Sequence, residues 1–314
     1  MNSCSLLSTN KVNIMKSFIR NIIYFVETLF LCLWILICRI IGIDLASALG
    51  SIFFKFIGPM SKFDKRATNN IKKVFPDINI KEQKKLKTNM WDNLGRNIGE
   101  FAFIKKLNPY NSEGINSLKN KPRFTITGEK HLEKIYNTNK GAIFFSAHIG
   151  NWEICPLIIS AKGLKVTSIY RHANNPVTEK IIQWLRQSVS FYAPKGPAGA
   201  KTLFKVLRNN EYAAILADQK LNEGKIINFL GHPAKTATAI AELSLKLSIP
   251  IVPIHVERIK GATFKYVIEE PIQNLKKNYT HEEELFLLLE KINKNIEKWV
   301  LKKPAQWLWI HNRW

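Results

Sequence analysis

Cysteine is scarce in this chain, with four residues among 314. Cys4, Cys32, Cys38 and Cys155 form no C-x-x-C pair, and no Cys/His spacing suits zinc. A disulfide-stapled miniprotein is therefore excluded, and we expect all four thiols to be reduced. We predict neither a metal site nor a cofactor.

Acidic residues are also few. The 24 Asp and Glu stand against 47 Lys and Arg, which gives a formal net charge of +23. Such an excess points to an anionic partner, which could be nucleic acid, an anionic membrane or an acidic protein. Hydrophobic residues make up 46% of the chain, so a disordered tail is excluded and a sizeable core can form.

One long apolar run covers residues 22–38. It reaches the lower end of the ~17–25 residues that span a bilayer, and Glu27 lies near its amino end, where it can reach the interface. A signal peptide is disfavoured, because the run exceeds an h-region and no small-x-small site follows it. A buried core helix is the open alternative. Residues 44–57 then predict an amphipathic helix with one apolar side, formed by Leu45, Leu49, Ile52, Phe53 and Phe56.

The charges around this run predict its orientation. More Lys and Arg follow the run than precede it, so the positive-inside rule places the main body in the cytoplasm. With a membrane anchor present, the positive charge more readily serves an anionic lipid surface than nucleic acid. No helix-turn-helix or RNA-recognition signature is apparent in the sequence.

Beyond residue 123, short apolar runs alternate with helical periodicity. This alternation predicts an α/β fold with a mostly parallel central sheet flanked by helices. A further helix is expected over residues 81–103. The predicted strands are 123–127, 142–146, 166–170, 212–217, 251–256 and 264–268, and the predicted helices are 151–161, 178–187, 198–207, 236–247 and 283–300.

The most informative local segment is Ser146–Glu153, which reads Ser-Ala-His-Ile-Gly-Asn-Trp-Glu after a predicted strand. Ligands bind at the carboxyl ends of strands in open α/β sheets, so we expect His148 at the mouth of a site. Glu153 would fall in a first helical turn, where its carboxylate can return to the imidazole and leave the other nitrogen as a base for an alcohol. Gly150 permits a sharp turn, and Asn151 can cap the helix. The competing interpretation is ordinary capping without catalysis.

Together with other segments in the same order, this motif resembles the H-x4-D/E motif of the lysophospholipid acyltransferase superfamily, in particular the bacterial lipid A biosynthesis late acyltransferases. The H-x4-E spacing alone is a weak signal, whereas the ordered set is strong. Two positions depart from the family pattern: His172 stands where Pro is usual after Tyr-Arg, and Lys195 where Arg is frequent, which loses a bidentate fork. The matching segments are 70–76, 91–100, 169–171, 217–219, 229–236 and 306–314.

The resemblance implies a membrane anchor at residues 1–58 and an acyltransferase catalytic domain at 59–314. It implies transfer of a fatty acyl chain from acyl carrier protein to a hydroxyl of a lipid A precursor, on anionic lipid at the cytoplasmic face of the bacterial inner membrane. In this family pattern His148 is the general base and Glu153 orients it. The expected substrate-binding residues are Arg171, Lys195, Asp218 and Asn151. Arg171 and Lys195 could instead be solvated surface residues. Asp218 could cap a helix, and Asn151 could only shape the turn.

Two other functions stay open. One is an acyltransferase that acts on another glycolipid or phospholipid acceptor, although the Phe-Pro-Glu-Gly-Thr-Arg block of glycerol-phosphate acyltransferases is not found in this sequence. The other is a membrane-tethered basic binding protein without enzymatic activity, which explains the charge but not the ordered motifs. The aromatic and cationic segment 306–314 can either lie at a membrane interface or pack into the core.

Overall fold

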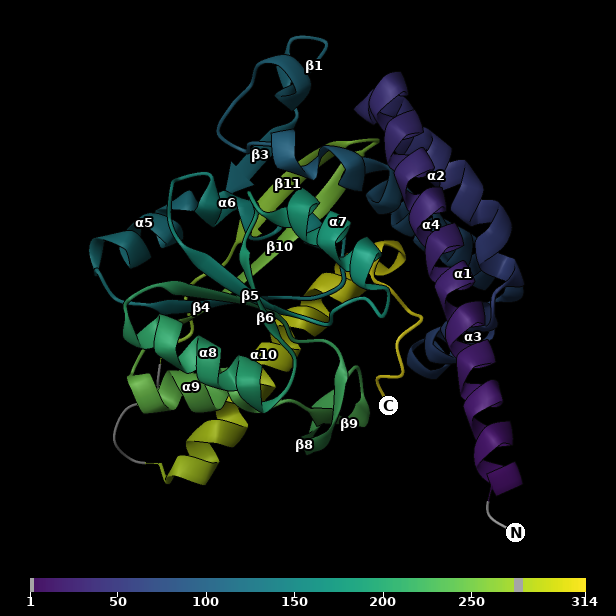
Figure 1. Ribbon diagram of the computed structural model, residues 1–314. Helices are drawn as coiled ribbons and strands as arrows, with labels where there is room; N and C mark the ends of the chain where they lie inside the picture. Colours follow the sequence, from purple (N-terminus) through teal and green to yellow (C-terminus); the bar gives the residue numbers. More distant parts are fainter. Residues whose placement is uncertain (1–2, 274–278) are drawn as a thin grey trace.

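A computed structural model describes residues 3–273 and 279–314, with side chains from Met15 onward. Within these residues a central sheet has seven strands in the order β3-β11-β10-β4-β7-β5-β6 (Figure 1). Neighbours pair in parallel except β10 and β11, which are antiparallel, so the predicted mostly parallel α/β sheet is confirmed. The strands are β3 (Phe124–Thr127), β4 (Ala142–Ser146), β5 (Val166–Tyr170), β6 (Phe191–Pro194), β7 (Tyr212–Leu216), β10 (Ile251–Lys260) and β11 (Thr263–Ile268).

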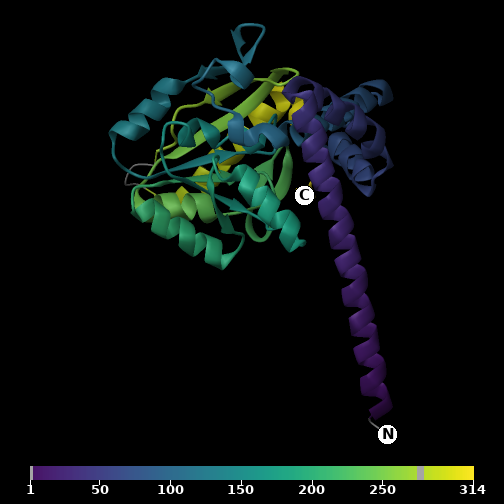
Figure 2. The same cartoon turned by 45° about the horizontal axis from the view of Figure 1, so that its top comes forward.

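Helices cover both faces of this sheet (Figures 1 and 2). β4 is buried on both sides, since Phe144 packs into a core with α5, α6 and α7, while Phe145 packs into a core with α8, α9 and α10. The helices are α1 (Ser3–Ile41), α2 (Ile43–Ile57), α3 (Lys62–Val74), α4 (Ile80–Glu100), α5 (Glu129–Asn137), α6 (Leu157–Ser160), α7 (Pro176–Arg186), α8 (Pro197–Arg208), α9 (Ala239–Leu247) and α10 (His281–Lys302).

The sequence pattern missed some elements. The edge strand β6 ends in a proline, and the hairpin of β8 (Lys220–Phe229) and β9 (His232–Thr236) begins with polar, exposed residues, so neither shows clear alternation. A second small hairpin joins β1 (Ser117–Leu118) and β2 (Lys121–Pro122). The single helix predicted over 151–161 is wrong. Pro156 divides that stretch into the 3-10 turn η4 (Trp152–Ile154) and the short α6.

α1 is longer than the predicted run at 22–38. Met15–Ile41 and Ile43–Met60 are both long and apolar enough to cross a membrane, by length and composition. One side of α1 is nevertheless bonded to the body of the protein. The Asn175 side chain donates to the Tyr24 carbonyl at 2.8 Å and to Glu27 at 3.3 Å, so Glu27 has a polar partner on this side.

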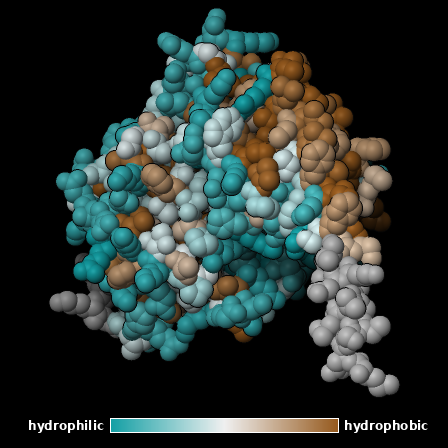
Figure 3. All heavy atoms as spheres, viewed as in Figure 1, coloured by the Kyte–Doolittle hydropathy of each residue, from teal (hydrophilic) through white to brown (hydrophobic). Residues whose placement is uncertain are grey.

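The outer sides of α1 and α2 are apolar and exposed. Side chains such as Phe25, Ile40 and Phe56 are 68%, 74% and 73% exposed. Figure 3 shows a hydrophobic band over this side of the molecule. α2 keeps the predicted apolar side, but this side faces outward, while its small residues Ala46, Ser47 and Gly50 are buried against α4. A large exposed apolar surface of this kind is typical of a membrane or protein contact.

The thiols of Cys32, Cys38 and Cys155 are unpaired, as expected. Cys4 lies outside the residues whose side chains are described. Burial raises the pKa of Cys155 to about 12, so this thiol stays neutral and packs as a small apolar group.

The close contact of α2 with α4 generates a prediction. An added Cβ at Gly95 would meet the Gly50 carbonyl oxygen at 2.1 Å. Gly→Ala ordinarily stabilises a helix interior by about 0.5–1 kcal/mol, but here we expect Gly95→Ala to lower the free energy of unfolding by about 1–3 kcal/mol, because the backbones must separate. Chemical denaturation measures this, with Asn89→Ala on the exposed side of α4 as the control. If Gly95→Ala instead stabilised the protein by the ordinary Gly→Ala increment, the close packing of α2 on α4 would be contradicted.

Candidate active site

His148 and Asp218 meet at the carboxyl edge of the sheet. β4 and its parallel neighbour β7 end at Ser146 and Leu216, so the loops that follow them lie together. His148 Nδ1 lies 2.8 Å from Asp218 Oδ1, and the His148 backbone N–H donates to Asp218 Oδ2 at 2.9 Å. Because an ionised carboxylate only accepts, Nδ1 carries the proton, and in the neutral imidazole Nε2 then keeps its lone pair. This tautomer suits a general base.

Asp218 is fully buried, and the Trp307 indole N–H donates to its Oδ2 at 2.8 Å. Burial opposes the negative charge, but the charge and hydrogen bonds of His148 outweigh it and hold the pKa of Asp218 well below its usual range. The helix cap considered for Asp218 is therefore not its role, since strand β8 follows it and the carboxylate faces His148.

Gln219 lies at the other nitrogen of the imidazole. Its Nε2 is 3.3 Å from His148 Nε2 and 3.5 Å from His311 Nδ1. Lys195, just after β6, donates to Gln219 Oε1 at 2.8 Å. Burial, and then repulsion from Arg171, lower the pKa of Lys195. A hydroxyl that approaches Nε2 must displace the Gln219 amide.

His311 packs edge-on against His148, with ring centroids 4.4 Å apart. Burial, and then the charge of His148, lower the pKa of His311 from 6.5 to about 4, so it is neutral at pH 7. It belongs to the carboxy-terminal segment, in which Trp307, Trp309 and Arg313 are at most 1% exposed. This segment packs into the core and does not form an exposed interfacial cluster.

Glu153 does not contact the imidazole, so the predicted His148–Glu153 pair is wrong. Both oxygens of Glu153 accept hydrogen bonds from Arg186 on α7, at 2.7 and 2.8 Å. The cause is local, because residues 152–154 form a 3-10 turn rather than the first turn of an α-helix. The Arg186 guanidinium also lies over three aromatic rings, those of Phe101, Tyr170 and Tyr192.

An apolar cavity extends from this ion pair into the space beside the sheet. Its empty volume, which includes the space open to solvent, is about 580 Å³. Trp152 connects the cavity to the turn at residues 147–151, the candidate catalytic turn, since its ring centroid is 5.3 Å from that of His148. Trp152, Glu153 and Arg186 also line a second cavity, of about 660 Å³, whose other wall includes Leu31 and Trp34 of α1. The first cavity is lined mainly by apolar residues, among them Phe144, Cys155, Pro156, Ile159, Ile169, Ala214, Ile215 and Leu216.

The remaining predicted residues are placed differently. Arg171 follows β5 at the same edge of the sheet and is exposed, close enough to Lys195 to lower its pKa. Asn151 is 2% exposed, and its amide donates to Glu100 at 2.8 Å. It therefore does not cap the following turn, whose N-cap has no side-chain hydrogen bond, and it does not face an open site. Of the predicted site residues, the structure brings His148, Asp218 and Lys195 together at this edge of the sheet.

Three residues of this arrangement had no assigned role in the sequence analysis. Gln219 and His311 lie inside matching motif blocks, which is a usable signal for a site. Arg186 had no such signal, because a basic residue at the end of an amphipathic helix is typical of a helix carboxyl end.

The depressed pKa of His311 predicts a pH dependence of stability. Between pH 6.5 and about 4 the unfolded chain holds the His311 proton and the folded chain does not, so stability rises with pH in this window. Acidification from pH 7 to 4 lowers the unfolding free energy of the wild-type protein. We expect this decrease to be smaller in His311→Gln, by up to about 3 kcal/mol. Chemical denaturation at several pH values measures the slope. A variant with the wild-type slope would contradict the burial of a neutral imidazole.

Comparisons with known proteins identify the family of this chain. The family described as "Bacterial lipid A biosynthesis acyltransferase" matches residues 14–314. A lipid A biosynthesis acyltransferase of Haemophilus influenzae is 24% identical over 194 residues, which cover 60% of this chain and 58% of that protein. The similarity thus spans less than two thirds of the relative's length. Because the family match extends over nearly the whole chain, the chain belongs to the bacterial lipid A biosynthesis acyltransferase family.

Proposed function

We propose that this protein transfers a fatty acyl chain from an acyl carrier protein thioester to a hydroxyl of a lipid A precursor. Family membership supports an acyltransferase of lipid A synthesis. The observation that carries the chemistry is the His148–Asp218 pair, in which Nδ1 lies 2.8 Å from a buried carboxylate beside an apolar cavity.

In the proposed mechanism His148 Nε2 accepts the proton of the acceptor hydroxyl as its oxygen attacks the thioester carbonyl carbon. A C–O bond forms, and the resulting oxyanion is stabilised by the nearby ammonium of Lys195 and by backbone N–H groups. The C–S bond then breaks, and the leaving thiolate takes the proton from the imidazolium. Asp218 fixes the tautomer and stabilises the imidazolium throughout, the role first assigned to Glu153.

The apolar cavity is the proposed site for the acyl chain. Its lining is mainly apolar, and it begins at Trp152 beside the base. Glu153 and Arg186 form its polar wall, and we assign them to shaping this cavity rather than to proton transfer.

Positive groups at the mouth of the site fit anionic substrates. Lys195 and Arg171 follow neighbouring strands and can bind the phosphate of a lipid A precursor. The net charge of +23 favours an acidic acyl carrier protein and anionic lipid.

The exposed apolar sides of α1 and α2 support attachment to the bacterial inner membrane, with the sheet on the cytoplasmic face. Trp34 donates to the Ile98 carbonyl at 3.2 Å and Arg39 to the Ala102 carbonyl at 3.3 Å, so this part of α1 is fixed to the body along one side. A helix held in this way can bury only its other side in lipid. We therefore propose that this part of α1 lies in the membrane surface rather than across it.

The proposed base predicts a loss of transfer in purified variants. We expect His148→Ala to lower kcat by at least about 10³-fold, and Asp218→Asn by about 10²–10⁴-fold, because the amide favours the wrong tautomer. The assay follows acyl transfer from an acyl carrier protein thioester to a phosphorylated lipid A precursor in detergent. His281→Ala, at an exposed histidine of α10, is the matched control and should keep wild-type turnover. Retained turnover in folded His148→Ala would contradict the mechanism.

The cavity predicts a change in chain-length preference. Ala214 lines it from β7, so Ala214→Leu shortens the available space. We expect the ratio of turnover for long over shorter acyl donors to fall about 10-fold or more. Ala200→Leu on the exposed side of α8 should leave the ratio unchanged. An unaltered chain-length profile in Ala214→Leu would place the acyl chain elsewhere.

A further inference from the structure

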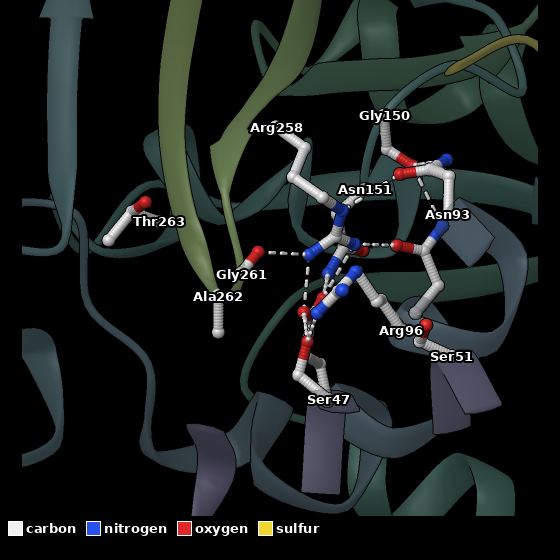
Figure 4. Close-up of polar contacts among 12 residues, drawn as sticks. Ser47, Ser51, Asn93, Arg96, Gly150, Asn151, Arg258, Gly261, Ala262 and Thr263 are labelled. Atoms are coloured by element: carbon white, nitrogen blue, oxygen red, sulfur yellow. Dashed lines mark hydrogen bonds and ion pairs between the residues drawn. The ribbon is translucent and has the colours of Figure 1, made fainter. Parts of the chain in front are cut away.

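A stripe of polar residues on α4 is buried beneath the catalytic turn. Asn93, Asn97 and Glu100 recur at helical spacing on one side of the helix and are 5%, 2% and 1% exposed. They surround Arg258 of β10, which is 7% exposed. Figure 4 shows Asn93 beside the Arg258 guanidinium, with Gly150 close by. Neither the family motif nor the proposed proton transfer gives these four residues a role.

Arg258 uses all of its five N–H donors within this cluster. Its Nε donates to Asn93 Oδ1 at 2.8 Å, and its terminal nitrogens donate to Asn97, to both oxygens of Glu100 and to the Gly261 carbonyl. Because the amide oxygens of Asn93 and Asn97 face the guanidinium, their NH₂ groups must face the other way.

Both NH₂ groups donate to a single atom, the carbonyl oxygen of Gly150. The distances are 2.9 Å from Asn93 and 2.7 Å from Asn97. Glu100 accepts the Asn151 amide at 2.8 Å, so the next residue of the turn is held as well. A carbonyl and the following N–H belong to one planar unit, so this clamp fixes the direction of the Gly150–Asn151 peptide.

The clamped peptide lies two residues after His148. Gly150 has φ +57°, and an added Cβ would meet the Val256 carbonyl oxygen at 1.7 Å, so the turn is tightly packed. The Gly150 N–H donates to the Gln306 carbonyl, and the Leu308 N–H donates to the His148 carbonyl. The turn is therefore fixed by α4 at one end and by the carboxy-terminal segment at the other.

We propose that Asn93, Asn97 and Glu100, ordered by Arg258, are positioning residues that hold His148 at Asp218. The proposal deepens the proposed function and rests on it. A buried ion pair with buried amides gains little stability over apolar residues of similar size, because desolvation offsets the attraction. What such a network provides is a single geometry, and a misplacement of about 1 Å costs about 10²-fold in rate.

The other side of α4 explains why it can act as a rigid support. Gly95 and Gly99 pack against the backbone of α2, and Ser47 of α2 donates to Glu100 at 2.7 Å. The network therefore also joins the catalytic turn to the helix pair that carries the exposed apolar surface.

The test compares kcat, KM and unfolding temperature in Asn93→Ala, Asn97→Ala and the double variant, with the donor and acceptor above. We expect the double variant to lose about 10²-fold in kcat with both KM values within about 2-fold of wild type. Asn151→Ala leaves the partners of Arg258 in place and should lose about 10-fold in kcat. It tests the same role if the double variant does not fold. Asn116→Ala is the matched control, since Asn116 is also 5% exposed and bonds the Asn108 N–H away from the turn.

The proposal is overturned if the folded Asn93 and Asn97 variants keep wild-type kcat. It is also overturned if Asn116→Ala, at an equal drop in unfolding temperature, loses as much kcat as they do. A loss in kcat confined to the variants that touch the turn supports it. A wild-type protein without transfer, or a fully active His148→Ala, overturns the proposed function itself and the positioning role with it. An active wild type with unaffected Asn93 and Asn97 variants overturns the positioning role alone.

Discussion

A single buried carboxylate determines how the site is built. Asp218 accepts hydrogen bonds from the His148 ring, the His148 backbone and the Trp307 indole. A buried charge is costly unless several donors compensate it, so these three groups must stay together. The carboxy-terminal segment consequently folds back over the catalytic turn, where Ile149 pairs with Trp307. The tryptophans of this segment pack against one another, against Phe229 of β8 and against Phe75 after α3.

The two sides of α4 make different contacts. Glycines on one side allow α2 to approach closely, while polar residues on the other side reach the catalytic turn. The outer sides of α1 and α2 keep large apolar residues exposed. In the proposed function, α4 therefore joins the candidate membrane anchor, α1 and α2, to the candidate site. The second cavity, which touches both α1 and the Glu153–Arg186 pair, lies along that connection.

Sequence patterns predicted those elements whose structure depends on residues adjacent in the chain. β4 is a short apolar run and α10 has clear helical periodicity, and the positions of both were predicted within a few residues. The link from His148 to Asp218 spans 70 residues and depends on β4 lying beside β7, an order that no spacing in a single sequence encodes. Glu153 was assigned as the partner from its closeness in sequence and from the H-x4-E motif, whereas in the structure both of its oxygens accept from Arg186. The buried side of α4 was equally hidden, since its asparagines resemble a solvated helix face until Arg258 is placed beside them.

The proposed role of the His148–Asp218 pair is to catalyse acyl transfer to a lipid A precursor. The most direct measurement is mass spectrometry of lipid A from cells that lack the gene and from the same cells complemented with wild-type or Asp218→Asn protein. The account predicts that lipid A loses the mass of one acyl chain on deletion, regains it with the wild-type gene, and does not regain it with Asp218→Asn at equal protein level. Unchanged lipid A in the deletion strain, or full restoration by Asp218→Asn, would contradict it.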